Sequence, residues 1–143
     1  MRVDEGIKRP KRATMQSAGY DFFAPMDIAL KPGEWTEFGT GVYLDGTEFL
    51  VGKDADPVFT PWMLMMVPRS GLGFKYMVRL ANTAAVIDPD YRGEIRCKLT
   101  ADKNIMITKG TAYAQGIFVP VLYLSDEDIP TETRIGGFGS TDR

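Results

Sequence analysis

Short apolar runs separated by turn residues are the feature that most constrains the fold of this sequence. Between residues 26 and 52, runs of roughly five residues (MDIAL, WTEF, GVYL and TEFLVG) alternate with turn signals, among them Pro32-Gly33, which favours a type II turn. The apolar run at residues 60–67, TPWMLMMV, predicts a strand that is buried on both faces. No apolar stripe with helical periodicity is long enough to build a helical bundle. We therefore expect an all-β sandwich or barrel.

Further strands are expected towards both ends of the sequence. Residues 18–25, AGYDFFAP, predict a short buried strand, and the runs IRCKL, NIMIT and IFVPVLYL predict three more. Residues 109–115, KGTAYAQ, predict a turn that brings Gln115 to the start of the last strand.

The composition restricts the class of protein. The chain has 143 residues, which suits one domain with a substantial core. Its 17 basic and 19 acidic residues give a net charge of −2, so charge supplies no reason to expect nucleic-acid or membrane binding. The single cysteine, Cys97, excludes an intramolecular disulfide, and the N-terminus lacks the apolar region of a signal peptide. We expect a cytoplasmic protein.

The sequence contains no histidine, which limits the chemistry that it can perform. Ser-His and Cys-His nucleophile pairs are excluded, as are metal sites that depend on histidine. Acid and base roles must therefore fall to carboxylates, tyrosine, lysine or water.

The stretch at residues 84–94, AAVIDPDYRGE, holds the main catalytic candidates. An apolar run leads into Asp88 and Asp90 around a proline, and Tyr91 follows, which predicts a strand, a tight turn and a strand. A carboxylate at a turn beside an aromatic face can orient a water and pack a ring in one place. Asp-Pro-Asp is also ordinary turn chemistry, so both interpretations stay open on these residues alone.

One short helix is expected after the 60–67 strand. Pro68 ends that strand, Ser70 is a suitable N-cap, and residues 71–76 form the helix. Backbone amides, the Ser70 hydroxyl and the Arg69 guanidinium would converge there as an anion site. An ordinary capped turn with a surface arginine fits these residues equally well.

Charged candidates also occur near the N-terminus. Asp21 is the one charge in the 18–25 strand, and it either satisfies a nearby arginine or backbone group or holds a metal-bound water. An exposed extended stretch and a phosphate site are both compatible with the four basic residues around Pro10, which are Lys8, Arg9, Lys11 and Arg12.

The last segment, residues 125–143, differs in composition from the rest of the chain. An acidic linker precedes RIGGFGSTDR, a sequence that cannot build a core by itself. The segment is either a disordered terminus or an arm that orders over a ligand. In the second case, contacts to an anion and to a ring would come from Arg134, Phe138, Ser140 and Thr141.

Taken in order, these segments resemble the five motifs of the homotrimeric dUTP pyrophosphatases, the dUTPases. The matching segments are AGYDFFA, PRSGLG, AAVIDPDYRGE, GTAYAQGIF and RIGGFGST. The resemblance implies a distorted β jelly roll (a β-clip barrel) with one short helix over residues 1–124, and a flexible arm at 125–143 that closes over an active site. Three copies would form a homotrimer whose active sites use motifs from more than one chain.

The reaction implied by the resemblance is hydrolysis of dUTP to dUMP and pyrophosphate, with Mg²⁺ on the triphosphate. It would keep uracil out of DNA and supply dUMP for dTMP synthesis, in the cytoplasm of a bacterium or of a phage-infected host. By position, Asp88 matches the carboxylate that orients and deprotonates the attacking water, and Tyr91 matches the aromatic residue under the deoxyribose. Asp21 matches a carboxylate that reaches the metal through water. The remaining matches bind substrate, namely Asn82 and the backbone from there to Ile87 for uracil, Arg69, Ser70, Gly71 and Gln115 for phosphates, and Arg134, Phe138, Gly139, Ser140 and Thr141 in the closing arm.

Three departures from the family pattern affect what the resemblance implies. Ala85 stands where the family usually has glycine, and Arg134 lies one residue closer to Phe138 than is common. The segment before Pro68 is longer than in compact members, which suggests an extra loop at residues 45–60. That loop would offer a contact to a protein partner.

Other functions stay open on the sequence. A dCTP deaminase of the same fold would carry a catalytic glutamate about where Lys98 stands, and a lysine does not readily take that role. A dUTP-binding regulatory or sensor protein on the same fold is a second alternative, although Asp88 together with Tyr91 favours catalysis. A capsid-like jelly roll without a ligand would leave five motif matches to coincidence.

Overall fold

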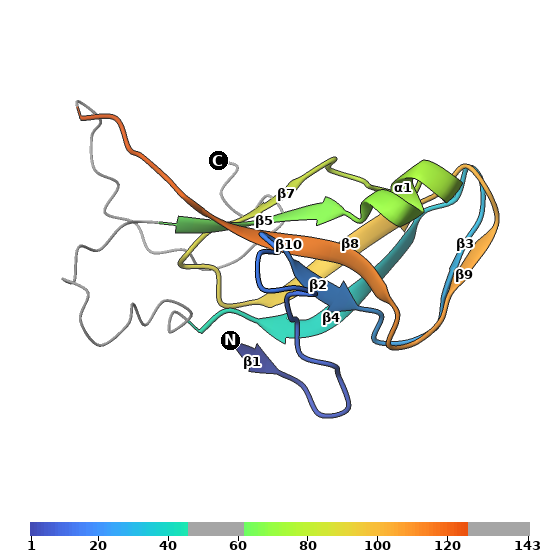
Figure 1. Ribbon diagram of the computed structural model, residues 1–143, viewed down its shortest axis with the longest axis horizontal. Helices are drawn as coiled ribbons and strands as arrows, with labels where there is room; N and C mark the ends of the chain where they lie inside the picture. Colours follow the sequence, from blue (N-terminus) through green and yellow to red (C-terminus); the bar gives the residue numbers. More distant parts are fainter. Residues whose placement is uncertain (46–61, 126–143) are drawn as a thin grey trace.

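Nearly all regular structure of the protein is β-strand, as the computed structural model shows for residues 1–45 and 62–125 (Figure 1). One sheet has the order β1-β4-β8-β6, with β1 (Arg2–Val3), β4 (Thr36–Tyr43), β8 (Glu94–Thr100) and β6 (Arg79–Leu80). A second has the order β2-β10-β5-β7, with β2 (Tyr20–Phe23), β10 (Ala112–Pro120), β5 (Trp62–Pro68) and β7 (Ala85–Ile87). The remaining elements of the described residues are the pair β3 (Ile28–Leu30) and β9 (Ile105–Ile107), and the helix α1 (Ser70–Tyr76). The predicted all-β fold with one short helix is confirmed.

Some predicted features lie outside the described residues. They are the strand TEFLVG with the loop that follows it, nearly all of the 45–60 insertion, and all but the first residue of the 125–143 arm.

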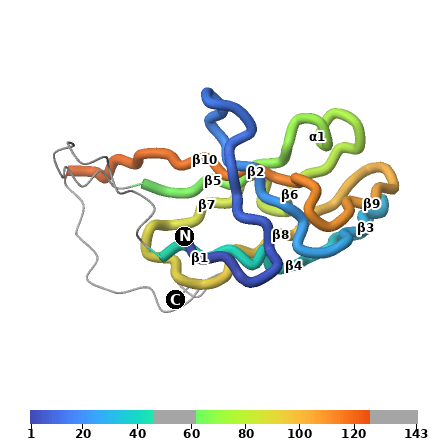
Figure 2. The backbone as a smooth tube through the Cα atoms, turned by 60° about the horizontal axis from the view of Figure 1, so that its bottom comes forward, coloured from blue at the N-terminus to red at the C-terminus, as the bar shows by residue number. Residues whose placement is uncertain are grey.

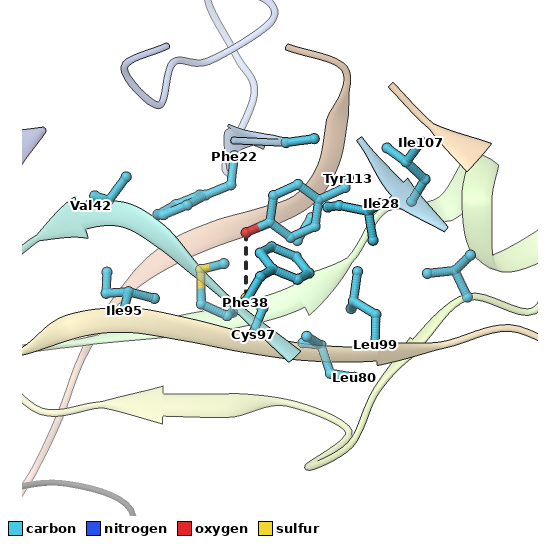
Figure 3. Close-up of a cluster of buried hydrophobic side chains, with 14 of the residues drawn as sticks. Phe22, Ile28, Phe38, Val42, Leu80, Ile95, Cys97, Leu99, Ile107 and Tyr113 are labelled. Atoms are coloured by element: carbon cyan, nitrogen blue, oxygen red, sulfur yellow. Dashed lines mark hydrogen bonds between the residues drawn. The ribbon is translucent and has the colours of Figure 1, made fainter. Parts of the chain in front are cut away.

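The two large sheets face each other across one hydrophobic core (Figure 3). In its centre, the ring of Tyr113 from β10 meets Phe38 from β4 edge to face, with ring centroids 5.2 Å apart. The Tyr113 hydroxyl donates a hydrogen bond to Cys97 Sγ of β8 at 3.5 Å. Burial raises the pKa of Cys97 to about 11, although the hydrogen bond from Tyr113 lowers it in part. The one thiol of the chain is therefore a neutral core group near pH 7.

Strand β5 is buried on one face only, which corrects the prediction for residues 60–67. Leu64 and Met66 are fully buried, whereas Met63 and Met65 are partly exposed. The reason is that β5 lies in a sheet with one face on the core, so alternate side chains point away from it. The outward side chains of β5 form an apolar surface of the chain.

Helix α1 begins one residue earlier than expected. Ser70 is its first residue, while Arg69 occupies the N-cap position with an extended backbone (φ −78°, ψ 136°) and without a side-chain capping hydrogen bond. The prediction of Ser70 as the N-cap is therefore wrong. The Arg69 carbonyl accepts hydrogen bonds from the amides of Leu72 (3.2 Å) and Gly73 (2.9 Å), which starts the helical turn at Ser70. Within residues 1–45 and 62–125, no helix has the length and apolar character that crossing a membrane requires.

The turn before β10 is shorter than the predicted turn at 109–115. It closes where the Thr111 amide donates to the Thr108 carbonyl at 3.0 Å. Strand β10 starts at Ala112, so Gln115 lies inside a strand rather than at its start. The two residues after Ala112 are fully buried in the core, a position that an exposed turn cannot provide. At its other end, β10 stops at Pro120, so the last four residues of the predicted strand IFVPVLYL lie outside it.

Strand β4 joins two runs that the sequence predicts as separate strands, WTEF and GVYL. A bulge keeps them together, with Gly41 at φ 68° and a register shift against β8 between Gly39 and Tyr43. The Gly41 amide donates to the Glu94 carboxylate at 2.8 Å. The two-residue β1 pairs with β4 as well, and it was missed because so short a strand carries no periodicity. The predicted turn at Pro32-Gly33 is confirmed, with φ 78° at its glycine.

Residues 88–93 carry the chain from one large sheet to the other. The predicted strand, turn and strand are confirmed, but β7 and β8 belong to different sheets and do not pair with each other. The turn closes where the Tyr91 amide donates to the Asp88 carbonyl at 3.1 Å. The Tyr91 hydroxyl then donates to the Glu94 carbonyl at 2.9 Å. These two hydrogen bonds fix the position of the ring relative to the crossing.

We predict that Gly93→Ala destabilises the protein, because the new methyl group has no room. A Cβ at position 93 would lie 2.5 Å from the Tyr91 hydroxyl oxygen and 2.7 Å from ring carbon Cζ. Displacing the ring breaks its hydrogen bond to Glu94, and we expect the free energy of unfolding to fall by about 1–3 kcal/mol. Chemical denaturation followed by tryptophan fluorescence measures this change.

Gly73→Ala is the matched control for this substitution. A Cβ at Gly73 would have its nearest neighbour at 3.9 Å, and alanine is the better helix former, so α1 should keep or gain stability. An equal loss in both variants would contradict the steric explanation.

Candidate functional site

Three of the predicted site residues come together on the outward face of the β2-β10-β5-β7 sheet. Asp21 of β2 lies opposite Gln115 of β10, and Gln115 lies opposite Val67 of β5. Opposite residues of antiparallel strands point to the same face, so these side chains form one row. Arg69 follows β5 directly, and its Nε lies 3.2 Å from Asp21 Oδ1. Figure 1 shows β2, β10 and β5 side by side.

The Arg69 guanidinium is held by contacts to two strands. Besides its ion pair with Asp21, its Nη1 donates to the Ala112 carbonyl of β10 at 3.3 Å. The side chain of Asp21 is 16% exposed and that of Arg69 is 39% exposed, so the cation still meets solvent. An exposed pair of this kind adds little to stability. Its clearer consequence is positional, since the cation is kept beside Asp21, the residue opposite Gln115.

Gln115 is positioned by a close approach to Gly19, the residue before β2. A Cβ at position 19 would lie 2.5 Å from Gln115 Oε1 and 3.1 Å from its Cβ, so any other residue here would require the amide to shift. The amide therefore packs against the backbone just before β2.

Ser70 and Gly71 continue the site onto the first turn of α1. Both residues are exposed, and a Cβ at Gly71 would meet no atom within 4 Å. Open space therefore lies beside the turn that follows Arg69. The Ser70 hydroxyl and the Arg69 guanidinium belong to residues at this turn, and each can donate hydrogen bonds to phosphate oxygens.

Asp88 and Tyr91 form a second group, which follows the C-terminal end of β7. Asp88 follows Ile87 directly, and Ile87 lies opposite Leu64 of β5. Asp88 is partly buried, and the Tyr91 ring packs against the edge of the core. The hydrogen bond from the Tyr91 hydroxyl to the Glu94 carbonyl engages the polar end of the side chain.

Asn82 lies in the turn between β6 and β7. It is exposed, its carbonyl accepts from the Ala84 amide at 2.6 Å, and Thr83 has φ 61°. The predicted uracil site runs from here to Ile87, whose side chain is only 8% exposed and packs in the core. Ile87 can therefore offer a ligand its backbone but not its side chain.

The two groups are separated within one chain. The row of Asp21 and Gln115 crosses β5 at Val67, whereas Ile87, which precedes Asp88, crosses it at Leu64. Three residues of strand correspond to about 10 Å, and Asp88 lies beyond that point. The structure thus brings together Asp21, Arg69 and Gln115, but it does not bring Asp88 or Tyr91 to them.

The described residues offer little to a metal ion by themselves. No group of three or more aspartate, glutamate or cysteine side chains within residues 1–45 and 62–125 is arranged to hold one. Asp21, the predicted metal contact, already pairs through Oδ1 with Arg69. Mg²⁺ needs six oxygen ligands and usually keeps several waters. The residues therefore fit Mg²⁺ only where a bound polyphosphate supplies most of the remaining ligands.

Five predicted substrate-binding residues lie outside the described residues. They are Arg134, Phe138, Gly139, Ser140 and Thr141 of the arm.

Lys11 is a residue that the sequence did not single out from its basic neighbours. Its amide and carbonyl pair with those of Asp21, at 3.3 and 2.8 Å, so it extends the row of Asp21 and Gln115 by one position. The five-residue pattern around Pro10 indicated an extended stretch, but nothing in it indicated which strand it would join.

Comparisons with known proteins match the chain to one family throughout. A family model described as dUTPase matches residues 54–142. A deoxyuridine 5'-triphosphate nucleotidohydrolase of Nautilia profundicola is 36% identical over 138 residues, covering 92% of this chain and 89% of its own. The enzyme of the same name from Desulfitobacterium hafniense is 34% identical over 149 residues, covering 99% and 91%.

Solved structures agree on the fold. A dUTPase from phage phi11 of S. aureus, described with a structural Mg(II) ion, superposes with a TM-score of 0.69 at 18% identity. The match covers 90% of this chain and 94% of the phage protein. At this identity the likeness concerns the architecture of the sheets.

Proposed function

This chain belongs to the dUTPase family, and we propose that it hydrolyses dUTP to dUMP and pyrophosphate at a site shared between copies of the chain. Relatives at about 35% identity are named for this activity, which makes the chain a dUTP diphosphatase by family. The observation that carries the proposal is the outward row in which Asp21 lies opposite Gln115 and pairs with Arg69, since a guanidinium and an amide suit a polyphosphate.

The proposed chemical step is attack of water on the α-phosphorus of dUTP. Asp88 accepts a proton from the water as the new P–O bond forms, and the bond to the β-phosphate oxygen breaks to release pyrophosphate. Arg69, Ser70, Gly71 and Gln115 bind the phosphate oxygens on which charge develops. No histidine is needed, in agreement with the composition.

Base and sugar selection are assigned to the two ends of β7. The backbone from Asn82 to Ile87 pairs with uracil, and the Tyr91 ring packs under the deoxyribose, where a 2′-hydroxyl would clash. The ring can do this because its hydroxyl is already bonded to the Glu94 carbonyl and holds it in place.

Mg²⁺ enters this proposal on the triphosphate. Bound there, it would neutralise phosphate charge and orient the chain of phosphates. Asp21 would contact it through water with the oxygen that is not paired with Arg69.

Association of copies would complete the site. Asp88 lies away from the row of Asp21 and Gln115 within one chain, so in this proposal a second copy supplies it. The surface between the two groups is apolar, with Val86, Met65 and Ile117 in one cross-strand row and Val86 59% exposed. Covering such a row is favourable, and a closed trimer would repeat the contact three times.

The remaining assignments concern the ends of the chain and its setting. Residues 1–124 form the catalytic domain, and residues 125–143 close over a site with Arg134 and Phe138. The 45–60 loop is available to a protein partner. The enzyme works in the cytoplasm, where it lowers dUTP and supplies dUMP for dTMP synthesis.

Deamination of dCTP is a weaker alternative. Lys98, which stands about where the deaminase glutamate would, is exposed on β8 opposite Glu37 and belongs to neither group of site residues. Binding of dUTP without turnover would indicate a regulatory role instead of catalysis.

The test of the function is pyrophosphate release from dUTP with Mg²⁺, measured beside dCTP, dTTP and UTP, with ammonia followed in the same reactions. We expect release from dUTP alone, with dUMP as the product. Ammonia from dCTP would move the protein to the deaminases. Binding of dUTP by the folded protein without turnover would support the regulatory alternative.

Asp88→Asn should remove most turnover and keep dUTP binding, because the amide keeps the shape of the side chain but cannot take a proton. Loss of a general base lowers kcat by roughly 10²–10⁴-fold. Steady-state kinetics and calorimetric titration with a non-hydrolysable dUTP analogue measure the two properties. Asp90→Asn in the same turn is the control, and we expect its kcat to stay within a few-fold. An unchanged rate in the Asp88 variant would remove it from the mechanism.

Mixed assemblies should recover activity that neither variant has alone. In co-expressed Asp88→Asn and Arg69→Gln chains, random pairing leaves about a quarter of shared sites with both residues intact. Chains that carry different affinity tags allow the mixed assembly to be isolated and assayed. The double variant, with both substitutions in one chain, is the control that should stay inactive. If the mixed assembly is as inactive as its parents, the site lies within one chain and the shared-site proposal fails.

A further inference from the structure

The N-terminal basic segment, residues 8–12, lies beside the row of Asp21 and Gln115, and this position gives it a use that the five motifs do not supply. Figure 2 shows the segment crossing from β1 in one large sheet to β2 in the other. At its end, Lys11 pairs with Asp21 through two backbone hydrogen bonds of 2.8 and 3.3 Å. The segment thus adds a further position to the edge of the β2-β10-β5-β7 sheet.

The register puts the Lys11 side chain on the site face. Lys11 lies opposite Asp21, and Asp21 lies opposite Gln115. Residues opposite each other on antiparallel strands project to the same face, which here is the one away from the core residue Phe22. The row on this face therefore runs Lys11, Asp21, Gln115.

Lys8 reaches the same region from the other side of Pro10. Its Nζ lies 3.9 Å from the centroid of the Phe23 ring, a cation–π contact that holds an otherwise flexible side chain in place. Phe23 follows Asp21 by two residues on β2 and is not part of the main core cluster. Pro10 between the two lysines is buried, which anchors the segment.

The local charge is unlike that of the whole chain. The protein carries a net charge of −2, but four of the five residues from 8 to 12 are basic and exposed. Among the described residues, no ion pair within 4 Å joins Lys8 or Lys11 to a carboxylate, and Asp21 is paired with Arg69 instead. Exposed cations that are not in an ion pair and lie on one side of a site attract anions.

We propose that Lys8 and Lys11 bind the polyphosphate chain of the ligand, at the end of the row where β2 is the edge strand. This inference rests on the proposed function for the identity of the ligand, a nucleoside triphosphate, but the binding of a polyphosphate does not depend on turnover. The two ammonium groups extend the set of phosphate donors beyond Arg69, Ser70 and Gln115. They add charge without a fixed geometry, as lysine does at phosphate sites.

The test compares two pairs of lysines with the same change in charge. Lys8→Gln with Lys11→Gln is the test variant, and Lys31→Gln with Lys103→Gln, both exposed in turns at the β3–β9 end, is the control. Calorimetric titration with inorganic tripolyphosphate, at low and high salt, measures binding without requiring turnover. We expect about a three- to ten-fold loss of affinity for each lysine of the test pair, and a weaker dependence on salt.

Kinetics with dUTP supply a second readout. The test pair should raise KM and leave kcat within about two-fold, because these lysines contact the ground state as much as the transition state. Compared with Lys11→Gln, the variant Lys11→Arg should retain most of the affinity for tripolyphosphate, since the positive charge stays at the same place. The substituted side chains are exposed and the backbone hydrogen bonds of Lys11 remain, so the variants should fold.

The outcomes separate this inference from the proposed function. Equal affinity in the test variant and the parent, equal losses in both pairs, or no binding of tripolyphosphate by the parent would each overturn the inference. If tripolyphosphate binding depends on Lys8 and Lys11 while dUTP is not hydrolysed, the inference stands and the proposed function fails.

Discussion

The candidate site depends on the register between β2, β10 and β5, and glycines fix that register by close approach. A Cβ at Gly116 would lie 2.8 Å from atoms of both Leu64 and Phe22, so β10 can pack here only with glycine facing the core. Because side chains alternate, the neighbouring Gln115 must then face outward, beside Asp21. A slip of one residue would turn Gln115 into the core. The position of this site residue therefore depends on how β10 packs against the core.

The register of β7 against β5 places Asp88 away from that row, and the crossing at residues 88–93 holds it there. Tyr91 is tied to Asp88 through its amide and to Glu94 through its hydroxyl, so the turn has little freedom to swing back. Glu94 is itself engaged with the Gly41 amide in the bulge of β4. The location of Asp88 is thus determined by the pairing of β7 with β5 before it and by the contacts of the turn and the opposite sheet after it.

The sequence predicted local structure well where a single residue type determines the backbone. Pro32-Gly33 and the turn after Ile87 are of this kind, since proline and glycine restrict the backbone in place. Errors arose where tertiary packing decided. The start of β10 at Ala112 depends on burial of the next residues, and Ser70 failed as an N-cap because Arg69 already closes the first turn. The residue types of the site could be predicted from the motifs. The proximity of these residues in space depends on strand pairing, which no local pattern in the sequence specifies.

The division of the site residues into two groups has a consequence for how folding and activity are related. The core between the two large sheets is complete in one chain, with Tyr113 and Cys97 satisfied at its centre, so the fold does not need the site to form. The site residues, by contrast, are separated by the outward apolar row that includes Met65 and Val86. Association that buries this row would gain roughly 25 cal/mol per Å² of apolar surface and would bring the two groups together in the same step. In the shared-site arrangement, substitutions on this row would therefore lower activity through assembly while leaving the fold of each chain intact.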